Sequence, residues 1–491
     1  MMTSKNIQTP QTKSHVIVSK LANPRYPRKP PFDPSEEYPE IENILVEKSE
    51  TNEVYAAVRR VLGALRFDCE NFGNPKWNPL RELVPEGGSV VIKPNLVSEP
   101  RESNADPCSV ITHASVVRPL IDYCLKAVGE SGKVVVADAP QFDSDFESII
   151  KINGLYETVS TLSERIGRPI PLLDLRAEKA IVEGGVVARR IKLNGDPLGY
   201  TIIDLGERSY LTEVKDFADR FRGSDYDRAE TISHQIGGHH EYSIANTILG
   251  ANCVISVPKL KTHKKAGVTL NLKNFIGING SKNFIPHYRI GTTYRGGDEM
   301  AESSLKGDLM SYAYHSAEKL LPKLKQPGIS LMRYLGKIDK KMMQGNDTML
   351  GAGDWRGNDT IWRCILDLYF ILLFATANRS FERIPQRKLL GIIDGVIAGE
   401  GNGPLNPESR SEGLIIGGES LVATDLTAIA AMGLDFNSYP TYSFLKEPLV
   451  QGSIADFANG IEVETSEGGR VSIRALRESV DRPFDLPDGW K

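Results

Sequence analysis

Four strongly apolar runs in the sequence share one feature, because each ends in a short polar cluster that contains proline or glycine. They read VVIKPN (90–95), VVVADAP (134–140), VISVPKLKTH (254–263) and LGIIDGVIAGEGNGP (390–404). Aliphatic runs of this kind are typical of strands buried on both faces, as in a parallel sheet covered by helices. We therefore predict an α/β protein with a mostly parallel central sheet and flanking helices, in which the polar ends of the runs converge on one edge.

The segment between the first two runs has helical periodicity. Residues 112–132, THASVVRPLIDYCLKAVGESG, place apolar side chains on one helical face, and Thr112 is available as the N-cap. A strand, a helix and a second strand in this order form a βαβ unit, whose two strands are parallel. This pattern supports the parallel arrangement.

Composition and pattern change along the chain and predict soft domain limits. Residues 1–13 are polar, residues 22–40 contain six prolines, and short runs broken by Gly, Asn and Asp after residue 170 indicate a β-rich insertion. The predicted parts are an N-terminal extended and partly disordered segment (1–50), a first α/β part (51–165), a β-rich insertion (166–241), the basic segment of the α/β core (242–300), a helical region (301–380) and a C-terminal α/β part (381–491).

Composition excludes several classes of protein. The 491 residues are 40% hydrophobic and 25% charged with a net charge of -4, which argues against a general nucleic-acid binder. The five cysteines form no CxxC pair, so we expect neither disulfides nor a thiolate metal cluster, and a cytoplasmic location is the simplest. The run LYFILLFATA (368–377) is too short to span a bilayer, so we expect no membrane partner. The oligomeric state is left open.

Residues 253–297 form a local positive segment in this near-neutral chain. The segment contains no Asp or Glu, and its first lysines follow directly after a buried strand. Its basic residues are Lys259, Lys261, Lys264, Lys265, Lys273, Lys282, Arg289 and Arg295. Open α/β sheets bind their ligands at the carboxyl ends of the strands. The sequence therefore predicts a site for an anionic small molecule.

The alternation in PKLKTH identifies the candidate catalytic residues. In an extended chain Lys259, Lys261 and His263 point to one side, which suits a phosphate or a carboxylate. A lysine held among other cations has a lowered pKa and can act as a base, and His263 is the candidate proton carrier. The alternative is a solvated edge with exposed lysines.

Further polar side chains at the strand ends are candidates for substrate binding. Lys93 and Asn95 end the first run, and the alternation in GVTLNLKN places Thr269, Asn271 and Lys273 on one face. Asn274 can continue the site or cap a turn. The loop GEGNGP contributes Asn402, although it matches neither GxGxxG nor a P-loop.

Two groups of residues raise the question of a metal. Asp138 and Asp394 each follow a buried strand and can hold a divalent ion together with a phosphate, or act as counter-ions for the lysines. A second group comprises His234, His239, His240 and Glu241, whose spacing matches neither HExxH nor a standard zinc motif. A divalent metal is thus the one cofactor that the residues suggest, and its requirement is left open.

Several motifs together resemble the domain of unknown function 362 family. They are PKLKTHKKAGVTLNLKNFIGINGSK, IKPNLV, ADAPQFDSDFE, GGDE, GNDTIWRCILDL and IDGVIAGEGNGP, within residues 85–435. Some members of the family carry a ferredoxin-like iron–sulfur segment, but this chain lacks its cysteines, so we expect no iron–sulfur cluster. The same region adds His287, Arg289, Asp298 and Glu299 to the candidates. The resemblance implies no particular activity.

Two functional hypotheses remain. The first is an enzyme that binds a phosphorylated or carboxylated metabolite in a pocket of Lys, His and Asp side chains at the strand ends. The second is a non-catalytic ligand-binding or maturation protein that uses the same pocket. The sequence indicates neither the substrate nor the reaction class.

Overall fold

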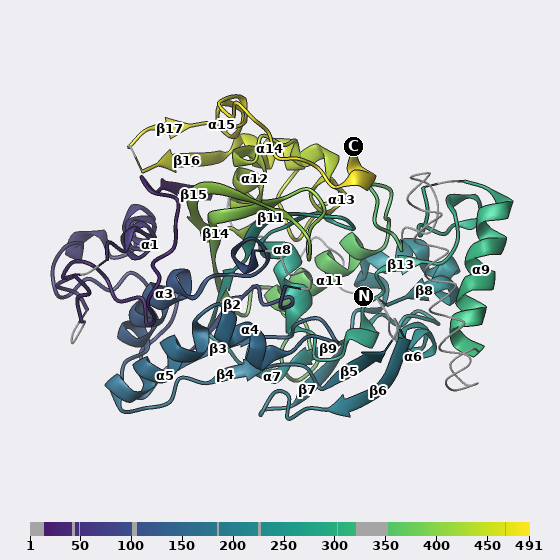
Figure 1. Ribbon diagram of the computed structural model, residues 1–491, viewed down its shortest axis with the longest axis horizontal. Coiled ribbons are helices and arrows are strands. Elements are labelled where there is room, and N and C mark those ends of the chain that lie inside the picture. Colours follow the sequence, from purple (N-terminus) through teal and green to yellow (C-terminus); the bar gives the residue numbers. More distant parts are fainter. Residues whose placement is uncertain are drawn as a thin grey trace.

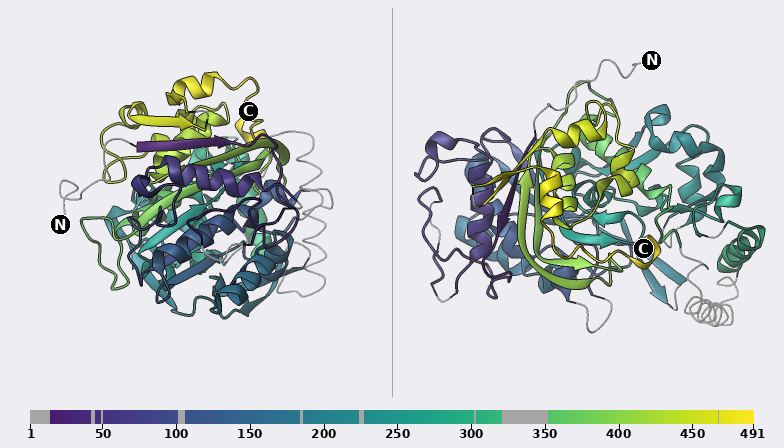
Figure 2. Two further views of the ribbon diagram at one scale, coloured as in Figure 1. Left: turned by 90° about the vertical axis from the view of Figure 1, so that its left-hand side faces the viewer. Right: turned by 90° about the horizontal axis from the view of Figure 1, so that it is seen from above.

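A large mixed sheet runs through the molecule, with helices against both faces (Figures 1 and 2). The computed structural model describes residues 14–41, 45–48, 50–100, 106–183, 186–223, 227–301, 303–320, 352–466 and 468–491. Residues 1–13 of the predicted disordered segment and residues 321–351 of the predicted helical region lie outside this part. The strands of the sheet are β1 (Ser14–Lys20), β2 (Ser89–Pro94), β3 (Lys133–Asp138), β4 (Leu172–Asp174), β10 (Cys253–Val257), β11 (Lys259–His263), β12 (Gly267–Thr269), β14 (Lys388–Glu400), β15 (Glu408–Gly418), β16 (Ile461–Thr465) and β17 (Arg470–Val471).

The four apolar runs form four neighbouring parallel strands. The order along the sheet is β17-β16-β1-β15-β14-β10-β2-β3-β4, and the pairs β14–β10, β10–β2, β2–β3 and β3–β4 are parallel. Strand β15 is antiparallel to both β14 and β1, so the sheet is mixed but mostly parallel. The predicted α/β class is confirmed, and the carboxyl ends of the four strands lie on one edge.

Helices cover both faces of the sheet, which explains why its strands are continuously apolar. On one face the side chains of Ile92 and Ile255 join a core with α1 (Glu53–Ala64), α3 (Ala114–Val128) and α5 (Leu155–Ile166). On the other face Val91 and Val254 join a core with α7 (Asn246–Leu249), α8 (Asn271–Asn274), α11 (Ile361–Phe374) and α12 (Leu421–Ala431). Figure 2 shows the two helical layers on opposite sides of the sheet.

The remaining elements lie mostly around the predicted β-rich insertion and the chain ends. The other helices are α2 (Pro107–Val110), α4 (Phe146–Ile152), α6 (Arg228–Ser233), α9 (Leu305–Leu320), α13 (Pro440–Ser443), α14 (Ile454–Asn459) and α15 (Ile473–Glu478). Three two-stranded antiparallel sheets pair β5 (Glu178–Glu183) with β6 (Val186–Lys192), β7 (Tyr200–Asp204) with β9 (Glu241–Ala245), and β8 (Phe221–Arg222) with β13 (Tyr288–Arg289). Strand β4, by contrast, extends the main sheet in parallel with β3.

The N-cap of α3 differs from the prediction. Residue His113 caps the helix, because its Nδ1 accepts the N–H of Ser115 at 3.2 Å. The hydroxyl of Thr112 instead donates to the carbonyl oxygen of Val257 at 2.6 Å and accepts the N–H of Asn95 at 2.9 Å. Thr112 therefore joins the ends of β10 and β2, and the next residue serves as the cap.

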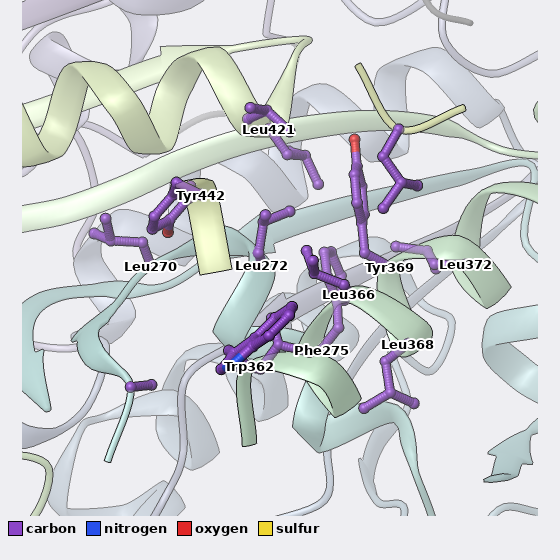
Figure 3. Packing of buried hydrophobic residues seen from close by; sticks show 14 of the residues in the cluster. Leu270, Leu272, Phe275, Trp362, Leu366, Leu368, Tyr369, Leu372, Leu421 and Tyr442 are labelled. Atoms are coloured by element: carbon purple, nitrogen blue, oxygen red, sulfur yellow. The ribbon is translucent and has the colours of Figure 1, made fainter. Parts of the chain in front are cut away.

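Helix α11 is a buried core helix, as the sequence predicts for its apolar run. Every residue of the helix is buried, and in the described part of the chain no helix is long and apolar enough to cross a membrane. Figure 3 shows the side chains of α11 beside Leu272 of α8 and Leu421 of α12. The carboxylate of Asp367 accepts hydrogen bonds from Tyr210 N–H at 2.8 Å and the Tyr242 hydroxyl at 2.8 Å, which tie the helix to the β-rich insertion.

Substitution of a core leucine of α11 tests this packing. Leu366 is fully buried, so Leu366→Ala removes apolar contacts and leaves a cavity. We expect a loss of about 2–5 kcal/mol in the free energy of unfolding, measured by urea denaturation. The control Leu198→Ala, at a side chain that is 65% exposed, should change it by less than about 0.5 kcal/mol. Equal effects of the two substitutions would contradict the described core.

Candidate functional site

Two buried ion pairs lie near the level at which β2, β3 and β10 end. Lys93 Nζ of β2 lies 2.7 Å from Asp138 Oδ1 of β3, and both side chains are at most 4% exposed. Lys259 Nζ of β11 lies 3.0 Å from Asp394 Oδ2 of β14, and both side chains are fully buried. Lys259 and Asp394 are also register partners, because β11 runs parallel to the second half of β14. The fold therefore brings four of the predicted residues into two pairs. Asp394 does not follow its strand as predicted but lies in the middle of it, because β14 continues to Glu400 through pairing with β11 and β15.

The Lys93–Asp138 pair is held on every side by polar groups. Lys93 Nζ also donates to Asn274 Oδ1 at 2.9 Å, and Asn274 Nδ2 donates back to the Lys93 carbonyl oxygen at 3.0 Å. Asp138 Oδ2 accepts the N–H of Leu96 at 2.7 Å. A Cβ on Gly277 would overlap the Asp138 carboxylate, so only glycine lets that segment pass so close. Burial lowers the pKa of Lys93, while Asp138 opposes the shift.

The Lys259–Asp394 pair includes two residues that the sequence did not identify. The Tyr26 hydroxyl donates to Asp394 Oδ1 at 2.5 Å and accepts from Lys259 Nζ at 2.6 Å. The His113 N–H donates to Asp394 Oδ2 at 3.0 Å, and the His113 ring stacks on Tyr26 with 4.1 Å between centroids. Burial raises the pKa of Tyr26, with a further contribution from Asp394, and burial lowers the pKa of His113 to about 3. Both aromatic side chains are therefore neutral at pH 7.

Three further lysines at this edge have no carboxylate partner in the described part of the chain. Lys261 Nζ donates to the carbonyl oxygens of Val110 at 2.5 Å and Pro404 at 3.0 Å. Lys282 Nζ likewise donates to two backbone carbonyl oxygens, at 2.8 and 3.0 Å. The ammonium group of Lys273 has neither a hydrogen-bond nor an ion-pair partner among the described residues.

The three lysines and the nearby pairs influence one another electrostatically. Burial lowers the pKa of Lys273 to about 8, and the positive charge of Lys93 adds to this effect. Burial lowers the pKa of Lys282 to about 7, although Asp138 opposes the shift. The pKa of Lys261 lies well below its usual value because of burial and the charges of Lys273 and Lys259. Their positive charges therefore act on one shared region of the strand-end edge.

His263 lies in the same positive field and is neutral. Its Nδ1 accepts the N–H groups of Lys265 at 3.0 Å and Ala266 at 3.2 Å, so the neutral ring carries its proton on Nε2. Burial and the charges of Lys273 and Lys261 hold its pKa well below the usual value. His263 can thus act as a hydrogen-bond donor at neutral pH.

A second histidine, His287, is neutral for the same reasons. Burial lowers its pKa to about 3, and the charges of Lys265 and Lys273 contribute. Its Nδ1 lies 2.9 Å from the carbonyl oxygen of Ile285, which indicates a proton on Nδ1 and leaves Nε2 as an acceptor. The two histidines therefore have opposite tautomers in one positive region.

The family model described as Domain of unknown function (DUF362) matches residues 90–203 and 206–430. The chain belongs to this family. No curated protein and no solved structure matches the chain. The matched residues include nearly all of the four parallel strands and every lysine described above, so the strand-end edge is part of the DUF362 domain.

Three predicted ligand residues of the DUF362 domain retain hydrogen-bonding capacity. Asn95 Oδ1, Thr269 Oγ1 and Asn271 Oδ1 are buried atoms without a hydrogen-bond partner in the described part of the chain. A buried polar atom without a partner carries a desolvation cost, which a bound ligand can offset. Asn271 is otherwise fixed, because its Nδ2 donates to Asp425 Oδ1 at 2.8 Å.

Other predicted substrate-binding residues have protein partners. Asn402 Nδ2 donates to Asp488 Oδ2 at 2.8 Å and holds the C-terminal segment. Arg289 donates to the carbonyl oxygen of Gly296 at 2.8 Å and lies 3.6 Å from Asp298 Oδ2. Glu299 lies 2.9 Å from the ring of His315. These contacts stabilise the loops around the site, and a role in substrate binding stays a prediction for Arg289 and Asn402.

The two carboxylates expected as metal ligands each lie against a lysine. Asp138 is paired with Lys93, and Asp394 with Lys259, which is the arrangement expected of counter-ions. A divalent ion at either carboxylate would have to compete with an ammonium group at hydrogen-bond distance. The metal role of these two residues stays a prediction.

Some residues at this edge of the sheet belong to no sequence pattern that predicts a binding site. Tyr26 lies in the proline-rich segment, where a tyrosine forms no periodic pattern. Lys282 is one of the counted basic residues, but no alternation singles it out. Lys265, by contrast, has a carboxylate partner, because it lies 2.7 Å from Asp354 and over the ring of Tyr288.

Removal of one partner of a buried pair tests its contribution to stability. Asp138→Ala leaves the Lys93 ammonium group buried without a carboxylate, and we expect a loss of about 3–5 kcal/mol in the free energy of unfolding. Urea denaturation at pH 7 measures the change. The control Glu478→Ala removes the partner of Arg474 from an exposed ion pair and should leave the denaturation midpoint unchanged. A stable Asp138→Ala variant would show that the pair is dispensable for folding.

Proposed function

We propose that this DUF362 protein binds an anionic small metabolite, phosphorylated or carboxylated, at the carboxyl ends of its parallel strands and acts on it as an enzyme. The observation that carries the proposal is a group of three lysines without a carboxylate partner among the described residues, namely the buried Lys261 and Lys282 and the half-buried Lys273. Buried cations are normally paired with anions. A bound anion would supply the missing negative charge.

The charge distribution favours a ligand with more than one negative charge. Two lysines of the edge, Lys93 and Lys259, are already neutralised by aspartates, so the uncompensated charge belongs to the other three. Lys273 is the strongest anchor in this proposal because its ammonium group is committed to no protein acceptor in the described part of the chain. A phosphate can accept several charge-assisted hydrogen bonds from such a cluster.

Lys273 can transfer a proton to or from a bound ligand, and His263 can donate a hydrogen bond to it. Lys273, with a pKa of about 8, exists in both protonation states near neutral pH. His263 presents its Nε2 proton as a donor. In this proposal Lys273 is the acid–base group, His263 donates a hydrogen bond to the ligand, Lys261 and Lys282 neutralise the anion, and Asn95 and Thr269 orient it with their free side-chain atoms.

The alternative is a non-catalytic ligand-binding or maturation protein that uses the same residues. The two proposals differ only in turnover. A metabolite pool incubated with the protein and analysed by mass spectrometry distinguishes them, because an enzyme depletes one anion and forms a product. Binding of an anion that is never converted would favour the alternative.

Removal of the unpaired lysine tests the anion site. We expect Lys273→Met to raise the dissociation constant for inorganic phosphate at least tenfold at pH 7, measured by isothermal titration calorimetry. The control Lys446→Met removes the same formal charge from a side chain that is 61% exposed, and it should leave the affinity unchanged. Unchanged phosphate and citrate affinity in Lys273→Met, with the fold verified by circular dichroism, would refute the proposal.

The lowered lysine pKa values predict a pH dependence of binding. Lys273 and Lys282 are charged below about pH 8 and 7, so an anion binds best below these values and more weakly as the pH rises. We expect the affinity for sulfate, whose own charge is constant in this range, to fall about tenfold or more between pH 7 and 9. Calorimetric titrations with sulfate at several pH values between 7 and 9 measure this change in affinity. A sulfate affinity that does not depend on pH would contradict a role for these lysines.

A further inference from the structure

A separate cluster of ionisable side chains lies at one end of the sheet formed by β7 and β9. Asp204 ends β7 and Glu241 begins β9, and the two residues are direct cross-strand partners. His239 precedes β9 by two positions. One nitrogen of His239 and one oxygen from each carboxylate all lie within 4.8 Å of one another. The histidine-rich segment HQIGGHHE is thereby joined to an aspartate that the sequence did not connect with it.

The Asp204 carboxylate is held in a fixed orientation. Its Oδ1 accepts the N–H groups of Gly206 and His240, each at 2.9 Å. Its Oδ2 therefore faces the Nδ1 of His239, at 2.7 Å. These three hydrogen bonds preorganise the carboxylate.

Glu241 is oriented by a second histidine. Its Oε2 lies 2.8 Å from the Nδ1 of His234. The His234 ring stacks on Phe284 with 3.5 Å between the ring centroids. A carboxylate that is fixed by a packed histidine has the same support that outer residues give to metal ligands.

The two carboxylates lack the cations that usually accompany such a pair. Like charges directly opposite each other on neighbouring strands are destabilising. In the described part of the chain neither Asp204 nor Glu241 forms an ion pair with a lysine or arginine. The His15–Glu464 pair of the main sheet differs, because Arg66 also lies 3.6 Å from Glu464. The cluster therefore keeps negative charge that a divalent cation would neutralise.

We propose that Asp204, His239 and Glu241 bind a divalent transition-metal ion of the zinc type. One imidazole and two carboxylates form a ligand set that suits Zn²⁺, Co²⁺ or Ni²⁺ better than Mg²⁺ or Ca²⁺, which prefer oxygen alone. Ligand atoms around a tetrahedral zinc ion lie about 3.4 Å apart, because each is about 2.1 Å from the metal. The three atoms lie within 4.8 Å of one another, so a contraction of up to about 1.4 Å closes the site. His239 is 64% exposed and can turn toward the ion. His234 is a positioning residue for Glu241.

Metal titration of the full chain tests the proposal. The protein is freed of metal with EDTA and titrated with ZnCl₂ by calorimetry, and with CoCl₂ by visible absorption. We expect one equivalent of zinc to bind, and His239→Ala, Asp204→Asn and Glu241→Gln each to weaken this binding at least tenfold. His234→Ala should weaken it about tenfold by releasing Glu241. The absorption bands of bound Co²⁺ should be lost or shifted in the same variants, which reports on the coordination sphere itself.

A variant at a different histidine–carboxylate pair serves as the control for zinc binding. His15→Ala removes a histidine from another His–carboxylate pair and should leave zinc binding unchanged. Circular dichroism and urea denaturation verify that the variants are folded, and Glu241→Gln preserves the shape of its side chain if another variant fails to fold. The proposal would be overturned if the unsubstituted protein did not bind one equivalent of zinc in the titration. It would also be overturned if Asp204→Asn, His239→Ala and Glu241→Gln all bound zinc as tightly as the unsubstituted protein.

Discussion

The buried ion pair between Lys93 and Asp138 is the contact on which the strand-end edge depends. It joins the ends of two neighbouring parallel strands, and through Asn274 it also holds α8 against them. Buried charges are tolerated when their hydrogen-bonding capacity is satisfied. Here the Leu96 N–H donates to Asp138, and Asn274 Oδ1 accepts from the Lys93 ammonium group. Gly277 packs directly against the pair, at a distance that leaves no room for a side chain. Lys93, which the sequence predicts to bind substrate, thus also stabilises the fold.

The edge separates its lysines into two groups with different capacities. Lys93 and Lys259 are neutralised by aspartates, and these two ion pairs hold neighbouring strands together. Among the described residues Lys261 and Lys282 donate to backbone carbonyl oxygens alone, which orient an ammonium group without cancelling its charge. Lys273 is bound to no group in the described residues. This difference explains why an anion would bind beside the unpaired lysines, although the whole chain carries a net charge of -4.

The sequence predicted the sheet well and the partners of its strand-end residues poorly, for physical reasons. Continuous aliphatic runs are typical of parallel strands covered by helices on both faces, and β2, β3, β10 and β14 follow this pattern. Partners depend on contacts between distant segments. Tyr26 binds Asp394 across 368 residues, and no local pattern encodes such a contact. The N-cap of α3 is His113 rather than the predicted Thr112, because the Thr112 hydroxyl binds the carbonyl oxygen of Val257 at the end of β10. Helix-capping preferences alone do not include such a contact with a distant strand.

The proposed metal cluster and the lysine edge share one short segment, residues 282–284. Phe284 supports the ring of His234, and its carbonyl oxygen accepts a hydrogen bond from Gln235 at 2.9 Å. At the other end of the segment, Lys282 points its ammonium group at the backbone near Asp138. An ion that fixed Glu241 and His234 would restrict Phe284 and therefore the turn that carries Lys282. Because Lys282 has a pKa of about 7, a small change in its surroundings would alter its charge near neutral pH. Residues 282–284 thus contact both proposed sites, and packing at this segment is the route by which an ion at one site would act on the other.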